Sequence, residues 1–223
     1  MLARTTSRRV VSVGLGGQIG ATDYSFDLDR ADLAGTFSAR LAAAAERATF
    51  IDISGRAIDA FSQQVDADYH EADITADPAE WPATLRETRC DVVVLGEVLE
   101  HLDAPGRALR GLQQLLAPGG IVVVTVPNAF NLSVTARMAV RDENVHPEHV
   151  AYYSPSTLTR LLESASLSVC ELAFYRTRPL RAAQLLRAPL GYLSGAVAER
   201  LPQFARGLIA VARPERTAVA RRA

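Results

Sequence analysis

The sequence predicts an α/β fold built on a doubly wound, mostly parallel β-sheet. Two apolar, β-branched-rich runs, at positions 92–95 and 121–126, are continuous and lack the alternation of a half-exposed strand. Such runs are typical of strands that are covered on both faces. Strand-like and helix-like segments also alternate along the chain with short links, which is the pattern of a doubly wound sheet. The 223 residues suffice for one such domain with a sizeable core.

The predicted elements follow in chain order. The strands are residues 10–15, 49–54, 67–74, 91–97, 121–127, 168–174 and 207–212, and the helices are 38–47, 56–64, 105–116, 155–165 and about 180–200. Ser154 before Pro155 indicates a helix start, and Gly119 with Gly120 indicates a helix stop. We expect one domain over 1–213, with a helical excursion at about 178–204 before the last strand. An Ala- and Arg-rich tail follows at 214–223.

Composition narrows the classes of function. The net charge of −1 argues against nucleic-acid binding. The sequence has no uninterrupted apolar stretch of the roughly 18 residues that a membrane span requires. The apolar run after Arg9 is short and continues into a glycine-rich turn, which does not fit a signal peptide. We therefore expect a cytoplasmic protein, in which Cys90 and Cys170 are reduced core residues.

Two features point to a nucleotide-like ligand. The first predicted strand runs into Gly14-Leu-Gly16-Gly17, and glycines allow both positive φ and a close approach of the backbone to a ligand. A dinucleotide fingerprint would place its third glycine at Ile19, which leaves a different cofactor loop or a plain tight turn. Asp52 ends the second strand, where a carboxylate accepts the hydrogen bonds of a ribose diol. Its alternative role is to cap the following helix.

The segment 91–128 is the most informative part of the chain. It combines a buried strand, a polar turn with Glu97, Glu100 and His101, a helix and a second buried strand. Its GEVLEHL, LLAPGG and VVVTVPN sequences resemble class I S-adenosylmethionine (SAM)-dependent methyltransferases, within them the group related to ubiquinone-biosynthesis-type O-methyltransferases. The resemblance extends over about residues 9–172. It implies a Rossmann-like, seven-stranded sheet whose last strand is antiparallel.

The resemblance also implies an activity and a cofactor site. The activity is SAM-dependent methyl transfer, most readily to oxygen, on a small-molecule, glycan or lipid-intermediate acceptor. The cofactor residues carried over are Gly14 and Gly16 around the methionine part, Asp52 at the ribose, Asp73 and Ile74 at the adenine, and Glu97 near the cofactor. Ser12 and Leu15 depart from the family's usual acidic residue and cysteine, and segment 17–50 is long. These departures support a further alternative, a non-catalytic binding module.

The E-x-x-E-H pattern allows a metal-assisted alternative. If residues 97–101 form a helical turn, Glu97, Glu100 and His101 share one face. Two carboxylates and an imidazole suit Mg²⁺ or Mn²⁺. Small-RNA terminal 2′-O-methyltransferases have a similar arrangement completed by a downstream histidine, here His146 or His149. The metal set of this alternative is Glu97, Glu100, His101 and His149, and the metal would activate a hydroxyl of a diol or an RNA end.

Without a metal, the acceptor side has other candidates. His101 or His149 is then the candidate general base, or positioning alone supports the reaction. The basic, amphipathic segment at about 180–204 can either lie on a membrane or pack on the sheet, and packing is the expectation. The sequence leaves the oligomeric state and the acceptor's identity open.

Overall fold

The computed structural model describes residues 8–15, 33, 36–138, 141, 146–175, 197 and 199–215. Its strands are β1 (Arg9–Val13), β2 (Arg47–Asp52), β3 (Asp68–Glu71), β4 (Cys90–Gly96), β5 (Leu116–Pro127), β6 (Leu167–Tyr175) and β7 (Gly207–Pro214). Its main helices are α1 (Phe37–Ala44), α2 (Gly55–Ser62), α3 (Ala83–Glu87), α4 (Pro105–Leu112), α5 (Leu132–Met138) and α6 (Pro155–Ser164).

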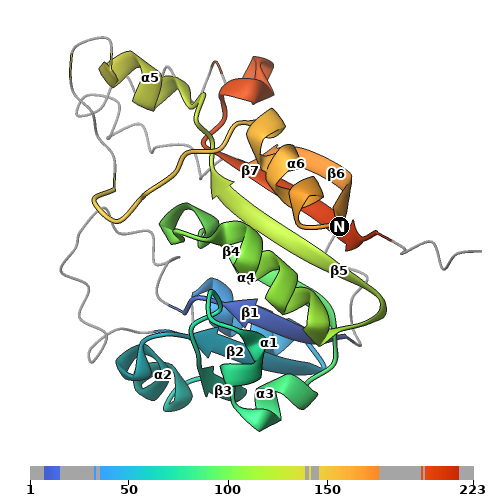
Figure 1. Cartoon of the computed structure of the whole chain (residues 1–223). Coiled ribbons are helices and arrows are strands. Elements are labelled where there is room, and N and C mark those ends of the chain that lie inside the picture. Colours follow the sequence, from blue (N-terminus) through green and yellow to red (C-terminus); the bar gives the residue numbers. More distant parts are fainter. Residues whose placement is uncertain are drawn as a thin grey trace, which may run out of the picture.

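All seven strands form one sheet in the order β3-β2-β1-β4-β5-β7-β6 (Figure 1). Strands β1 to β5 pair in parallel, whereas β7 runs antiparallel to both β5 and β6. The predicted α/β class, seven-stranded sheet and antiparallel last strand are therefore confirmed. The strand order reverses beside β1 and β4, and ligands of such sheets bind beyond the carboxyl ends of the strands at this point.

The side chains of β4 show why its apolar run is continuous. Val93 and Leu95 pack in a core cluster with residues of α3, α4 and α6. Val92 and Val94 pack on the opposite face, against residues of α1. Figure 1 shows α4 and α6 over the same face of the sheet. Both faces of β4 are buried, so neither set of alternating side chains needs to be polar.

Side-chain caps fix the starts of three helices, α1, α2 and α6. The hydroxyls of Thr36, Ser54 and Ser154 each accept a hydrogen bond from a backbone amide in the first turn of α1, α2 and α6. Ser154 and Thr157 complete a capping box, which confirms the predicted start of the helix at Pro155. Ser54 is the cap of α2, so Asp52 is left for another role.

The structure corrects one boundary and leaves others outside its range. Helix α4 ends at Leu112, and Gly119 and Gly120 lie within β5 at an irregular part of its pairing with β4. The prediction of a Pro-Gly-Gly helix stop was therefore wrong. The predicted helix at about 180–200 and the tail from 216 fall almost entirely outside the described residues. In the described part, no helix has the length and apolar character needed to cross a membrane.

Candidate functional site

Gly14 and Asp52 lie together where β1 and β2 end. Gly14 has a φ of +82°, and its amide donates to the Ile51 carbonyl at 2.9 Å. A Cβ at Gly14 would lie 2.9 Å from Cγ2 of Val98. Both the backbone conformation and this packing therefore require glycine. The next amide, of Leu15, donates to Oδ2 of Asp52 at 2.7 Å and joins the two strand ends.

Two backbone amides hold the Asp52 carboxylate in place. Oδ2 accepts from Leu15, and Oδ1 accepts from the amide of Ser54 at 2.8 Å. Each carboxylate oxygen keeps a second lone pair, so the group can still accept a ligand's hydroxyls. The next side chain, Ile53, is 71% exposed. An apolar side chain thus stands open to solvent beside an oriented carboxylate.

Asp73 and Ile74 follow β3 and are tied into its loop. Oδ1 of Asp73 accepts hydrogen bonds of 2.7 Å from both the amide and the hydroxyl of Thr75, and these bonds hold the pKa of Asp73 below its usual value. Ile74 is buried in the core cluster, and the indole of Trp81 donates to the Asp73 carbonyl. The carboxylate of Asp73 therefore remains at the surface, whereas the side chain of Ile74 faces inward.

Glu97 follows β4 and contacts a strand at the far side of the sheet. Its φ is +55°, and its amide donates to Thr125 of β5. The hydroxyl of Tyr175, at the end of β6, donates to Oε1 of Glu97 at 2.6 Å. Gly207 of β7 lies between them, and a Cβ there would overlap the Tyr175 ring. This glycine lets the ring cross β7 and reach Glu97.

The turn after β4 does not place Glu97, Glu100 and His101 on one face. Glu97 has a left-handed backbone conformation, and a 3₁₀ turn begins only at Leu99. Glu100 is fully buried, while the His101 side chain is 28% exposed. The expectation of a shared helical face was wrong, because one helical turn does not span all five residues.

Glu100 is a buried acid in an unusual environment. Neither of its carboxylate oxygens has a hydrogen-bond partner in the described part of the chain. Burial, followed by the charge of Glu97, raises the pKa of Glu100 to about 8. The neighbouring Tyr153 donates its hydroxyl to the Leu99 carbonyl, and burial together with Glu100 raises the pKa of Tyr153 to about 12. Glu100 is therefore mostly protonated near pH 7.

A downstream loop brings two more histidines to His101. The amides of residues 150–151 donate to the Glu100 carbonyl at 2.9 and 3.2 Å, which fixes this loop against the turn after β4. The ring centroids lie 4.6 Å apart for His101 and His149, and 4.9 Å apart for His146 and His149. The histidine cluster, defined here as His101, His146 and His149, has one nitrogen of each ring within 4.8 Å of the others.

Two rings of the histidine cluster, those of His101 and His149, favour their neutral forms. Burial, followed by His101 and His146, lowers the pKa of His149 to about 4. Burial and His146 also lower the pKa of His101, against the opposing charge of Glu148. Nδ1 of His149 is buried and has no hydrogen-bond partner among the described residues. In the tautomer with its proton on Nε2, this Nδ1 carries a lone pair that no described residue uses.

The four residues of the predicted metal set thus divide into two groups. The electrostatic neighbours of Glu100 are Glu97 and two tyrosines. Those of His101 and His149 are the other imidazoles and Glu148. The structure groups the imidazoles with one another and leaves both carboxylates of the E-x-x-E-H pattern outside that group.

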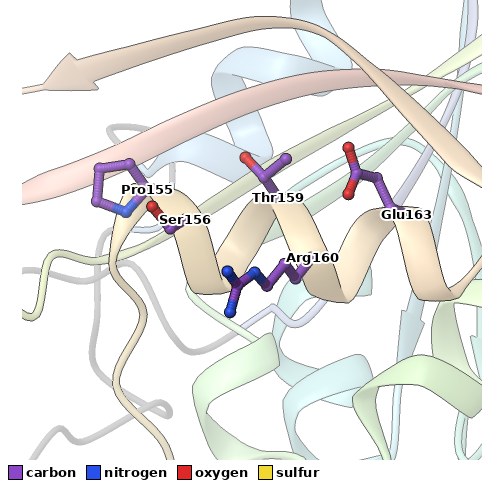
Figure 2. Close-up of a pocket in the computed structure, with 5 residues that line it drawn as sticks. All are labelled: Pro155, Ser156, Thr159, Arg160 and Glu163. Atoms are coloured by element: carbon purple, nitrogen blue, oxygen red, sulfur yellow. The ribbon is translucent and has the colours of Figure 1, made fainter.

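A surface depression on α6 shares no lining residue with the groups described above. It is lined by Pro155, Ser156, Thr159, Arg160 and Glu163 (Figure 2). All five come from one helix, and none is a predicted site residue. The depression is open, so it offers little enclosure for a ligand, and the strand ends remain the candidate site.

Comparison with known families decides the class. Residues 34–172, more than half of the chain, match the methyltransferase domain family. The chain belongs to this family. The match runs from just before α1 into β6, and the glycine turn at Gly14 lies before it.

Individual relatives agree with this assignment. The chain is 27% identical over 190 residues to a ubiquinone biosynthesis O-methyltransferase of Aromatoleum aromaticum, covering 80% of this chain and 71% of the relative. A methyltransferase solved with the Trm112 activator of Haloferax volcanii has a TM-score of 0.64 at 16% identity, covering 98% and 88% of the two chains. The N-methyltransferase NodS of Bradyrhizobium japonicum, solved with S-adenosylhomocysteine, has a TM-score of 0.54 at 19% identity, covering 96% and 83%. At these identities the solved structures show the fold alone.

This chain is therefore a class I SAM-dependent methyltransferase, as its resemblance implied. Its structure brings Gly14 and Asp52 together, and Gly16 lies outside the described residues. Sequence reasoning missed Tyr175 and Ile53. Nothing in the sequence links Tyr175 to a residue 78 positions away. Ile53 had a usable signal, since it directly follows the strand-end carboxylate.

Proposed function

We propose that this methyltransferase transfers the methyl group of SAM to a hydroxyl oxygen of a small molecule or of a glycan or lipid intermediate. The observation that carries the proposal is the partly buried His149, whose Nδ1 has no hydrogen-bond partner in the described part. His149 lies in the loop fixed against the turn after β4. An oxygen acceptor must lose a proton, and a neutral imidazole there can accept it.

The residues at the strand ends fit SAM. Gly14 keeps the backbone free of a Cβ, Asp52 offers carboxylate lone pairs to the ribose hydroxyls, and the exposed Ile53 offers apolar surface to the adenine. We include Asp73, Ile74, Gly16 and Glu97 in the proposed cofactor site on the family resemblance. When bound, SAM supplies a methyl group activated by a sulfonium leaving group. The protein's own work is then to hold the acceptor oxygen close and in line.

The acceptor side supplies proton transfer and apolar surface. A pKa of about 4 makes His149 a weak base, so it takes the proton as the new bond forms rather than beforehand. His101 lies beside it as a second candidate base. Phe130, after β5, and Val150, after His149, are exposed apolar side chains that suit a partly apolar acceptor.

The named relatives include both an O- and an N-methyltransferase, so the atom methylated is the point to test. The test offers catechol and aniline separately to the enzyme with isotope-labelled SAM. We expect label on catechol oxygen. His149→Ala should lower kcat by about 10²- to 10⁴-fold while its affinity for S-adenosylhomocysteine is kept. His70→Ala, on β3, is the matched control. Methylation of aniline but not catechol would contradict the proposal.

A further inference from the structure

We propose that the histidine cluster binds one divalent transition-metal ion of the Zn²⁺ type. One nitrogen from each of His101, His146 and His149 already lies within 4.8 Å of the others. Around a tetrahedral Zn²⁺ with Zn–N distances near 2.0–2.1 Å, ligand nitrogens are about 3.3 Å apart. Closing the three rings onto an ion therefore requires shifts on the order of 1–1.5 Å, which side-chain rotations can supply.

The donor set favours this kind of ion over Mg²⁺ or Mn²⁺. Imidazole suits zinc, copper, nickel and iron, whereas carboxylate and carbonyl oxygens suit magnesium, calcium and manganese. The carboxylates of Glu97 and Glu100 lie outside the cluster. Among the described residues, no other set of three or more histidine, cysteine or acidic side chains comes together in this way.

A second observation points to a ligand at the same place. Nδ1 of His149 is buried and has no hydrogen-bond partner among the described residues. A buried polar atom without a partner is rare in folded proteins. A metal ion at the centre of the cluster would use this lone pair.

The surroundings of the other two rings are compatible with metal binding. Nδ1 of His101 lies 4.0 Å from a carboxylate oxygen of Glu148, so Nε2 is the nitrogen that remains available to bind an ion. A carboxylate behind a ligand histidine commonly orients the ring and raises its basicity. Nδ1 of His146 accepts a hydrogen bond from the Glu148 amide at 3.2 Å. Binding through His146 breaks this bond, so we expect the turn at 146–149 to rearrange when the ion binds.

Three protein ligands leave the fourth position of a tetrahedral ion open, as in catalytic zinc sites. With the ion bound, His149 is a metal ligand and no longer accepts a proton. An acceptor hydroxyl at the open position would instead have a lowered pKa and would be a better nucleophile. The use of the ion in catalysis rests on the proposed function. The metal site itself does not, because metal binding is measured without SAM or acceptor.

The chain contains four histidines, which allows a direct experiment. Chelator-treated protein is titrated with ZnCl₂ while the imidazole signals of all four histidines are followed by NMR. One equivalent of Zn²⁺ should shift the signals of His101, His146 and His149. The signal of His70, which lies on β3 near the Thr84 hydroxyl, should not move. MgCl₂ at the same concentration should shift none of them.

Calorimetry with Zn²⁺ on variants gives the second measurement. His146→Ala and His149→Ala should each weaken Zn²⁺ binding by at least about tenfold, while His70→Ala should bind as the wild type does. If either alanine variant fails to fold by circular dichroism, the corresponding asparagine variant replaces it. The proposed site would be wrong if Zn²⁺ shifted no NMR signal of the histidine cluster. It would also be wrong if Zn²⁺ bound the His146 and His149 variants as tightly as it binds His70→Ala.

The experiment also separates the site from the proposed function. Zn²⁺ binding at the cluster, together with methylation of aniline alone, supports the site and contradicts O-methylation. Methylation of catechol by protein whose cluster binds no Zn²⁺ supports O-methylation and contradicts the site.

Discussion

At the edge of the sheet where the parallel strands end, the titratable groups of the two halves have opposite environments. At the ends of β2 and β3, Asp52 and Asp73 are held by backbone amides and stay near the surface. In the turn after β4 and in the downstream loop, the carboxylate oxygens of Glu100 and Nδ1 of His149 are buried and have no hydrogen-bond partners among the described residues. The half with Asp52 and Asp73, called here the cofactor half, is thus already ordered to bind the proposed cofactor. The half with Glu100 and His149, called here the acceptor half, has polar atoms that a bound ligand would supply with partners.

The pKa shifts express the same contrast. Hydrogen bonds from Thr75 lower the pKa of Asp73 and so favour its charged form. Burial raises the pKa of Glu100 to about 8 and lowers that of His149 to about 4, so both groups favour their neutral forms. Donors aimed at a carboxylate stabilise its charge, whereas burial without donors penalises charge of either sign.

The largest expected effect tests the cofactor half. Asp52→Ala removes the acceptor of two backbone amides and of the proposed ribose hydroxyls. Hydrogen bonds to a charged group contribute about 1.5–3 kcal/mol each, so affinity for S-adenosylhomocysteine should fall roughly 1,000-fold. Calorimetry measures this directly, and Asp52→Asn should lose less.

Asp68→Ala is the matched control for this change. Asp68 is also a carboxylate, at the start of the neighbouring β3, but it bonds the exposed side chain of Arg47. Its removal should leave cofactor affinity within about threefold, because surface ion pairs contribute about 0–1 kcal/mol. Equal losses in the two variants would mean that Asp52 has no special role.

The next effect tests the acceptor half through the pH dependence of stability. The unfolded chain has a Glu100 pKa of about 4.3, and the folded chain has one of about 8. Below pH 4 both states are protonated and burial carries no ionisation penalty. As pH rises toward 8, only the unfolded state releases its proton, so folding stability falls. Glu100→Gln removes this penalty and should be more stable than the wild type by roughly 4–5 kcal/mol at pH 8.

Urea unfolding of chelator-treated protein at pH 4 and pH 8 measures the difference. At pH 4 the two proteins should have nearly equal free energies of unfolding, because a neutral acid and an amide are similar in size and polarity. A difference that stays constant across this range would show that Glu100 is not held neutral by the fold.

A smaller effect tests the contact that joins β6 to the end of β4. Tyr175→Phe removes the 2.6 Å hydrogen bond to Glu97 and should lower the free energy of unfolding by about 2 kcal/mol at pH 8. Burial already raises the pKa of Glu97, and the tyrosine opposes that rise. Without the hydroxyl the pKa rises further, so the loss should shrink near pH 4, where the carboxyl is protonated in both proteins.

Tyr69→Phe supplies the neutral comparison for that experiment. Its hydroxyl donates to the backbone carbonyl of Val65 at 2.8 Å. Loss of this bond should cost about 1 kcal/mol at both pH values. If the two tyrosine variants show the same pH profile, Tyr175 does not stabilise a carboxylate.

The same contrast explains what the sequence could predict. The continuous apolar runs of β4 and β5 reflect burial on both faces, and Asp52 was found because it ends a strand. Those signals are local. The grouping on the acceptor side depends on a loop held by the Glu100 carbonyl and on a ring that crosses Gly207. Such contacts join distant segments through backbone geometry, so the residue spacing in E-x-x-E-H could not predict them.

The smallest expected effect concerns Ile53 in the cofactor half, a residue that its position next to Asp52 could have identified from the sequence. Ile53 directly follows Asp52 and is 71% exposed, so truncation should cost little folding stability. If adenine packs on it, Ile53→Ala should weaken binding of S-adenosylhomocysteine by about three- to tenfold, or about 1 kcal/mol, because less apolar area is buried in the complex. Leu201→Ala, another exposed apolar side chain, should leave affinity unchanged. An affinity loss shared by both variants, or absent from both, would place the adenine away from the end of β2.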